Sequence, residues 1–153
     1  SYQYQSNKTK KNDIRMNKID KLRDYLLENY VDKDGDLDIS GLDFSEFMGN
    51  VYLNGMKVKR NIFQSDYIVG GDLYQDNHEV KGKVFQDEHE VGGDLYQDGH
   101  KVECNIVQYG HDVGGNLYQE DQTVKGNYYC CSVRVGGNIY ADEPTKLFKK
   151  VTR

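Results

Sequence analysis

The sequence has no tryptophan, a single proline (Pro144), three cysteines and no long apolar run. No stretch approaches the roughly 20 apolar residues of a membrane-spanning helix, so we predict no membrane partner. The N-terminus lacks the apolar segment of a secretory signal. The cysteines, Cys104, Cys130 and Cys131, are odd in number and lack metal-ligand spacing. We therefore expect reduced thiols in a cytoplasmic protein that binds no metal and no other cofactor.

Apolar residues are also scarce, because hydrophobic residues make up 37% of the chain and charged residues 29%. This supply is small for a compact globule, and it suits an elongated fold in which neighbouring repeats cover one another. The abundant residue types are glycine, with 16 copies, and tyrosine, with 13. The composition therefore favours a repeat protein.

The net charge of −5 conceals an uneven distribution along the chain. Residues 31–145 carry nine basic and 21 acidic side chains, whereas residues 1–30 carry seven basic and four acidic ones. Residues 146–153 add four basic residues and no acidic one. Because contacts to phosphates need lysine and arginine, we predict no direct nucleic-acid binding through the acidic body.

From residue 47 to residue 145 the chain consists of nine tandem copies of an 11-residue repeat with the consensus V-x-G-N/D-L-Y-Q and four polar residues. The consensus valine is position 1 of each copy. Position 2 alternates between glycine and, in most intervening copies, lysine, so the true period is 22 residues. A fixed period of this kind is the most informative feature that a sequence can offer about fold.

The repeat divides the chain into four parts. Residues 1–15 are polar and basic, and we expect them to be disordered or a non-native leader. Residues 16–30 are predicted to form a capping helix, residues 31–145 the repeat domain, and residues 146–153 a basic C-terminal tail.

The predicted helix has apolar residues at spacings of three and four, namely Ile19, Leu22, Leu26 and Tyr30. Asn17 is a suitable N-cap residue. An amphipathic helix immediately before a repeat array is typical of an end cap that covers the first strand edges.

Alternation of side chains along a strand places positions 1, 3, 5 and 7 on one face and positions 2, 4 and 6 on the other. The first face carries the apolar residues, so we predict that it is the interior. The 22-residue period then favours an all-β fold, a flattened β-solenoid whose coils have two strand-bearing sides. The alternative is an antiparallel β-meander with one strand per copy, for which Asn54-Gly55 and Asp98-Gly99 are suitable hairpin turns.

The V-x-G-N/D-L-Y-Q run, preceded by LDISGLDFSE at residues 37–46, resembles β-solenoid repeat proteins of the pentapeptide-repeat and bactofilin kind. It also resembles the short VxGNLYQ-type repeat proteins of bacteria and their mobile elements. The resemblance covers residues 37–145 and concerns the style of repeat, since 11 is not a multiple of five. It implies one functional possibility, because some pentapeptide-repeat proteins imitate DNA and inhibit enzymes that handle it.

Two sets of side chains are candidates for binding a partner. The aromatic residues at position 6 would stack into a ladder, and the acidic residues in the turns would form rows that could imitate a phosphate backbone. Both sets also have purely structural explanations, as ring stacking and as a soluble charged edge. The candidate partner-binding residues are Tyr74, Tyr96, Tyr118, Tyr140, Asp76, Asp87 and Asp98.

Three further motifs are better explained by structure. The glutamines at position 7 would form an amide ladder, and the four histidines at position 10 would be turn residues copied with the repeat. The aspartates of VDKDGDLD resemble the start of a calcium loop, but Leu37 occupies the place where such a loop needs glycine. We interpret this segment as a turn that leads into the first coil.

No catalytic motif is present in the sequence. We therefore predict a non-enzymatic module that binds a protein partner. The sharper hypothesis is a DNA-mimic inhibitor from a phage or other mobile element, of the anti-CRISPR kind, that acts on a nucleic-acid-binding enzyme. The alternative is a structural β-solenoid that self-associates into a homo-oligomer.

Overall fold

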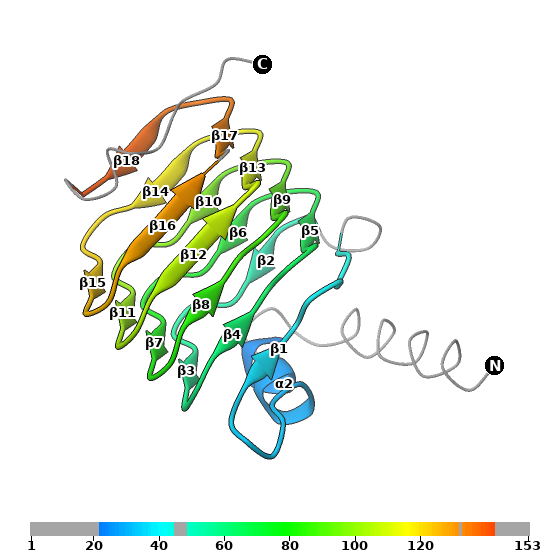
Figure 1. Cartoon of the computed structure of the whole chain (residues 1–153). Coiled ribbons are helices and arrows are strands. Elements are labelled where there is room, and N and C mark those ends of the chain that lie inside the picture. The colour runs from blue at the N-terminus through cyan, green and yellow to red at the C-terminus, as the bar shows by residue number, and fades with distance from the viewer. Residues whose placement is uncertain (1–21, 45–48, 132, 143–153) are drawn as a thin grey trace.

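The computed structural model describes residues 22–44, 49–131 and 133–142, and these form a β-solenoid of stacked coils (Figure 1). Every described strand pair is parallel. Paired residues such as Leu73 and Leu95 are 22 positions apart, which confirms the predicted coil length. The alternative of an antiparallel meander is wrong, because its neighbouring strands would run in opposite directions.

Each coil contributes to four parallel sheets, which we name A to D. Sheet A contains β1 (Leu37–Asp38), β4 (Ile62–Phe63), β8 (Val84–Phe85), β12 (Ile106–Tyr109) and β16 (Tyr128–Cys131). Sheet B contains β5 (Ile68–Val69), β9 (Glu90–Val91), β13 (Asp112–Val113) and β17 (Arg134–Val135). Sheet C contains β2 (Val51–Tyr52), β6 (Leu73–Tyr74), β10 (Leu95–Tyr96), β14 (Leu117–Gln119) and β18 (Ile139–Ala141). Sheet D contains β3 (Lys57–Val58), β7 (Glu79–Val80), β11 (Lys101–Val102) and β15 (Thr123–Val124).

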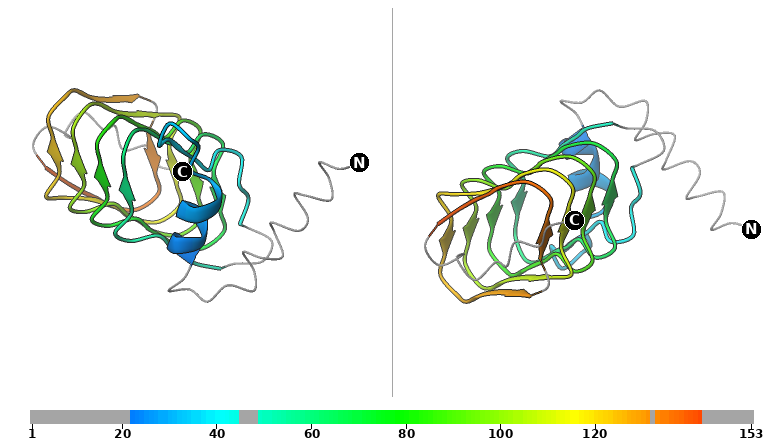
Figure 2. Two further views of the ribbon diagram at one scale, coloured as in Figure 1. Left: turned by 90° about the horizontal axis from the view of Figure 1, so that it is seen from below. Right: turned by 90° about the horizontal axis from the view of Figure 1, so that it is seen from above.

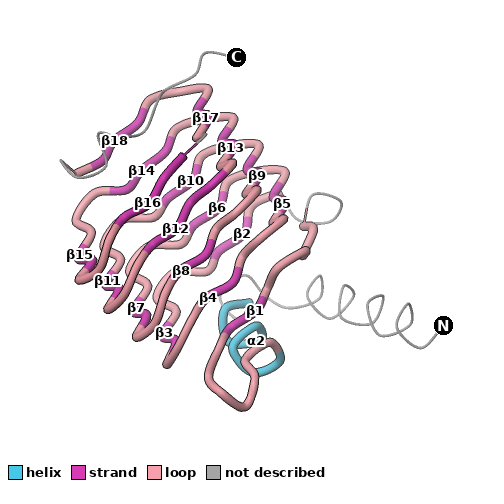
Figure 3. The backbone as a smooth tube through the Cα atoms, in the orientation of Figure 1, coloured by secondary structure: helices cyan, strands magenta, loops and turns pink. Residues whose placement is uncertain are grey.

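The coil is therefore four-sided, whereas the sequence predicted two strand-bearing sides. Most strands are only two residues long, and loops and turns join them (Figure 3). Each copy supplies one strand at positions 5–6 and a second that runs from position 11 into position 1 of the next copy. The reason lies at position 9, where the backbone has positive φ in seven successive copies: Gly55, Asp66, Asn77, Glu88, Gly99, Gly110 and Asp121.

The residue with positive φ at position 9 changes which side chains of the copy point inward. Positions 1, 5 and 7 face the interior, as predicted, but position 10 also faces inward and position 3 lies at a corner of the coil. Cys104, which replaces a position-3 glycine, is accordingly only half-buried. Its predicted place on the interior face is wrong.

The interior consists of stacked rows of like residues. Valine at position 1 and leucine, isoleucine or valine at position 5 form two apolar rows on each half of the coil, and nearly all are buried. Each fully buried side chain of this kind stabilises the fold by roughly 1.5–3 kcal/mol before entropy is counted. The glutamines at position 7 are buried as well, and Gln86 Nε2 donates to Gln64 Oε1 at 2.9 Å and to Gln97 Oε1 at 2.7 Å. The predicted amide ladder is thus confirmed, and it also links opposite halves of the coil.

The helix α2 (Leu22–Asn29) covers the first coil, at the end of the solenoid where β1, β2 and β3 lie (Figure 2). Leu22 and Leu26 are fully buried in the same core cluster as the first coils. Arg23 Nη1 donates to the carbonyl oxygen of Asn54 at 3.2 Å. The start of the predicted helix, with Asn17, lies outside the described residues, as do the predicted leader and the whole basic tail. Within the described part of the chain, no helix has the length and apolar character to cross a bilayer.

Candidate partner-binding surface

The two halves of each coil carry different outward side chains. The copies with glycine at position 2 supply the corner between sheets B and C, and the copies with lysine or glutamate there supply the corner between sheets D and A. We call sheets B and C with their corner the acidic half. We call sheets D and A with their corner the basic half.

The acidic half carries rows of carboxylates. Position 11 on sheet B contributes Glu90 and Asp112, position 4 contributes Asp72 and Asp94, and position 8 on sheet C contributes Asp76, Asp98 and Glu120. These seven carboxylates span three coils of about 4.8 Å each, which gives one negative charge per about 2 Å. Duplex DNA has one per about 1.7 Å. Ile68 and Arg134, at position 11 of the first and last strands of sheet B, are the exceptions in the row on that sheet.

The basic half carries the lysines. Sheet D and its corner hold seven basic residues, Lys57, Lys59, Arg60, Lys81, Lys83, Lys101 and Lys125, against two acidic ones, Glu79 and Glu103. Lys125 Nζ lies 2.9 Å from Glu103 Oε2, and this contact lowers the pKa of Glu103 and raises the pKa of Lys125. The lysines therefore gather on sheet D and its corner, apart from the carboxylate rows of sheets B and C, whereas sheet A of the basic half carries Asp38 and Asp87.

The position-6 tyrosines of the acidic half form one continuous stack. Their ring centroids are 4.6 Å apart between Tyr52 and Tyr74, and 4.5 Å apart between Tyr74 and Tyr96. The stack continues at 4.6 Å to Tyr118 and at 4.9 Å to Tyr140. Mutual stacking leaves most of these rings half-buried, and the terminal Tyr140 is the most exposed at 41%. The tyrosines therefore stack the coils on one another, as expected, and their rings also remain partly exposed on the outside of the solenoid.

Each hydroxyl group of the ladder lies near the position-4 side chain of its own copy. Tyr96 Oη donates to Asp94 Oδ2 at 3.3 Å, and Asn116 Nδ2 donates to Tyr118 Oη at 3.4 Å. Desolvation, and then the charge of Asp94, raises the pKa of Tyr96 to about 12. The ladder is thus fixed laterally as well as along the stack.

The position-8 carboxylates have a structural role besides their charge. The backbone N–H of Asp98 donates to Asp76 Oδ1 at 2.8 Å, and the N–H of Glu120 donates to Asp98 Oδ1 at 2.7 Å. Partial burial raises the pKa of Asp76. One oxygen of each carboxylate thus holds the next coil, and the second oxygen is not used in these bonds.

The structure brings together six of the seven predicted partner-binding residues, namely the four tyrosines with Asp76 and Asp98. Asp87 is separate, because it follows β8 and lies at the far edge of sheet A, where the chain turns toward sheet B. Asp87 belongs to a copy with lysine at position 2, so a half-coil separates it from Asp76 and Asp98. A surface made of all seven residues is therefore not formed.

A shallow groove runs along sheet B beside this surface. Its volume is about 380 Å³, and Gly92 and Gly114 form part of its lining beside Glu90 and Asp112. Gly92 cannot carry a side chain, because a Cβ atom there would lie 2.2 Å from the carbonyl oxygen of Gly70. The glycine row that distinguishes the acidic half is thus required by coil stacking, and it leaves a floor without side chains.

The histidines are interior residues, so their prediction as turn residues is wrong. His78, His89, His100 and His111 are at most 2% exposed and stack in pairs with centroids 4.8 Å apart. Burial lowers the pKa of His78 and of His111 to about 3 and that of His100 to about 4. The sequence contained a usable signal, because other copies place Met56, Tyr67 and Val133 at the same position, and all three are buried.

The segment that resembles a calcium loop is a turn, as expected. Asp32 Oδ1 accepts hydrogen bonds from the backbone N–H groups of Asp34 and Asp36, at 2.9 and 3.0 Å. Gly35 has a φ of 93°. In the part of the chain that the structure describes, no group of three or more histidine, cysteine, aspartate or glutamate side chains is arranged to hold a metal ion.

Comparison of this chain with protein-family models, with curated proteins and with solved structures gives no match.

Proposed function

We propose that this protein is a non-enzymatic binding module whose acidic half docks on a basic surface of a protein partner. The main support for this proposal is that the carboxylate rows and the tyrosine ladder lie apart from the lysines of sheet D. Complementary charge accelerates encounter and selects against wrong partners. Tyrosine supplies large contact area at low conformational cost, and stacking already restricts these rings.

The partner class that fits best is an enzyme that handles nucleic acid, such as a CRISPR effector. The carboxylates of the acidic half approach the linear charge density of duplex DNA, so a groove built for phosphates would attract them. In this hypothesis the protein occupies the groove and inhibits the enzyme. The resemblance to repeat proteins that imitate DNA supports the same hypothesis.

The experiment is affinity capture from nuclease-treated bacterial lysate at low and moderate salt, with mass spectrometry of the retained proteins. The variant Tyr96→Ala/Asp98→Lys changes the acidic half by two charges and one ring. Phe85→Ala/Glu79→Lys makes the same change on the basic half and is the matched control. Asp98→Asn keeps the oxygen that accepts the hydrogen bond from Glu120, so it removes the charge without breaking the coil contact.

We expect a salt-sensitive nucleic-acid-binding protein that is retained by the parent and by the control variant but is lost from Tyr96→Ala/Asp98→Lys. Purified partner should then lose nuclease or DNA-binding activity when the parent protein is added. Equal retention by both double variants would overturn the proposal. Capture of only the protein itself would favour self-association instead.

A further inference from the structure

Sheet D has an open edge at the N-terminal end of the solenoid. Its strand order is β15-β11-β7-β3, so β3 is the terminal strand. In sheet A, by contrast, β1 precedes β4 and completes that side of the first coil. Within the described ranges, no strand pairs with the outer edge of β3.

The hydrogen bonds of β3 show which backbone groups face this edge. Glu79 N–H donates to the carbonyl oxygen of Met56 at 2.8 Å, and Lys81 N–H donates to that of Val58 at 3.0 Å. Backbone groups of successive residues in a strand point to opposite sides. The N–H and C=O groups of Lys57 and Lys59 therefore face the open side, where the described residues provide them with no partner.

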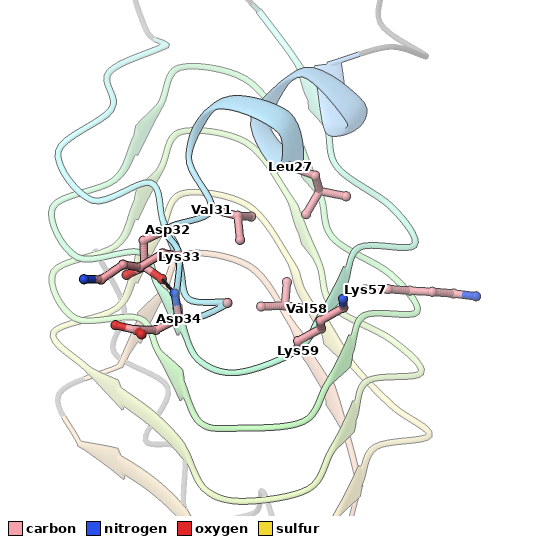
Figure 4. A pocket seen from close by; sticks show the side chains of 9 residues that line it. Leu27, Val31, Asp32, Lys33, Asp34, Lys57, Val58 and Lys59 are labelled. Atoms are coloured by element: carbon pink, nitrogen blue, oxygen red, sulfur yellow. Dashed lines mark hydrogen bonds between the residues drawn. The ribbon is translucent and has the colours of Figure 1, made fainter.

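A cavity of about 370 Å³ lies beside this edge. Leu27 of α2, Val31 and Val58 supply apolar side chains to it, with Asp32–Asp34 on one side and Lys57 and Lys59 on the other (Figure 4). It thus offers an apolar space directly beside unpaired backbone donors and acceptors.

The charges on sheet D indicate what would pair with β3. In the column at position 11, Lys57 is in register with Glu79, and Glu79 is in register with Lys101. In the column at position 2, Lys125 lies against Glu103. Opposite charges on neighbouring strands stabilise a sheet, and like charges destabilise it. A strand added beside Lys57 and Lys59 should therefore carry acidic residues.

We propose that β3 binds a short extended peptide in which one apolar residue lies between two acidic residues. The peptide adds a parallel strand to sheet D. Its acidic side chains lie beside Lys57 and Lys59, and its apolar side chain fills the space next to Val58. By the register of β3 and β7, the N–H of the apolar residue donates to the carbonyl oxygen of Lys57, and its own carbonyl accepts from Lys59 N–H.

Charge disfavours two other segments that could pair with the open edge of β3. Residues 1–21 of this chain carry six basic and two acidic side chains, which are of the wrong sign beside Lys57 and Lys59. A second copy that stacked end to end would place β15 on β3, and the residue that follows β15 is Lys125. The site thus fits an acidic peptide from another protein, and it is independent of the function proposed for the acidic half.

The test is fluorescence anisotropy of a labelled peptide Gly-Ser-Glu-Ile-Glu-Ser-Gly added to the full chain. Matched peptides replace both glutamates with lysine, or replace the isoleucine with N-methyl-isoleucine, which removes the N–H donor to Lys57. The variant Lys57→Glu/Lys59→Glu reverses the site, and Lys83→Glu/Lys101→Glu makes the same change elsewhere on the basic half. Amide hydrogen exchange of the free protein reports whether the edge is open.

We expect Lys57→Glu/Lys59→Glu and N-methylation each to weaken binding about tenfold or more, with little change for Lys83→Glu/Lys101→Glu. The amide of Lys57 should exchange quickly in the free protein and slowly in the complex. Equal binding of the lysine peptide, no effect of N-methylation, or no binding at all would overturn the proposal. Slow exchange of the Lys57 amide in the free protein would overturn it too, because the edge would then already be covered.

Discussion

Nδ1 of His89 lies 2.7 Å from Nε2 of His111 in the fully buried interior of the solenoid. At this distance the two nitrogens share one proton, with one ring as donor and the other as acceptor. Protonation of both rings would bring two N–H groups together. The outer nitrogens, His89 Nε2 and His111 Nδ1, have no hydrogen-bond partner among the described residues, so an added proton there would lie unpaired in the core.

The buried histidines predict loss of stability in mild acid. Their pKa values in the folded protein, about 3 for His78 and about 4 for His100, lie below the ordinary value of 6.5, so the unfolded chain binds protons first as pH falls. Stability is therefore full above about pH 6.5 and decreases toward pH 4, by up to about 1.4 kcal/mol per pH unit for each histidine. Urea unfolding at a series of pH values measures the slope.

The chain itself offers the control for this slope. Gln122 occupies position 10 in the coil after His100, and its Nε2 donates to the carbonyl oxygen of Gln97 as His100 Nε2 contacts that of Gln75. The variant His78→Gln/His100→Gln should fold and show a shallower decrease of stability with acid. An unchanged slope would mean that other groups cause the acid sensitivity.

On the acidic half, glycine at position 3 should be irreplaceable once a coil lies on its N-terminal side. A Cβ atom on Gly93 would lie 2.2 Å from Asp72 Oδ1 and 3.0 Å from the carbonyl carbon of Gly71. We expect Gly93→Ala to lower the free energy of unfolding by about 3 kcal/mol or more, as overpacking against backbone does. Gly49 occupies the same position in the first copy, and no atom of the described residues lies within 4 Å of a Cβ placed there, so Gly49→Ala should change the free energy of unfolding by less than about 0.5 kcal/mol. Thermal unfolding of the two variants gives the comparison, and equal values would contradict the close packing of the corner.

The central glutamine of the amide ladder should contribute more than the terminal one. The side chain of Gln86 donates to those of Gln64 and Gln97 and accepts from that of Gln108. The side chain of Gln64, at the end of the ladder, accepts the one bond from Gln86. Gln86→Ala leaves several buried amide groups unpaired, each at a cost of about 1–3 kcal/mol. Chemical denaturation should therefore show a larger loss for Gln86→Ala than for Gln64→Ala. The reverse order would show that the ladder does not act as a connected network.

The tyrosine ladder should resist ionisation. Desolvation and the charge of Asp94 raise the pKa of Tyr96 to about 12, above the ordinary value of 10. The contribution of Tyr96 to the free energy of unfolding is fully present below about pH 10 and is lost as the pH rises toward 12, because this tyrosine ionises first in the unfolded chain. The difference between the tyrosinate absorbance titrations of the parent and of Tyr96→Phe isolates this residue. Asp94→Asn should shift the transition toward lower pH, and a Tyr96 that titrates near 10 would contradict the packing of the ladder.

The sequence by itself determined the coil. Its period of 22 residues, the inward rows at positions 1, 5 and 7, and the separation of Tyr96 from Phe85 on opposite sides all follow from repetition, because identical units stack in identical ways. The alternation of Gly92 with Lys81 also indicated that the two sides of the coil differ.

Only the tertiary structure decided where the turns lie and what they bury. The residue with positive φ at position 9 is Gly99 in one copy and Glu88 in another, so no single residue type in the sequence predicts this turn. That turn directs His100 inward and makes the coil four-sided. Whether β3 has a neighbour likewise depends on the path of residues outside the repeat. Such long-range placement has no local signature, because it depends on which surfaces meet after the coils have stacked.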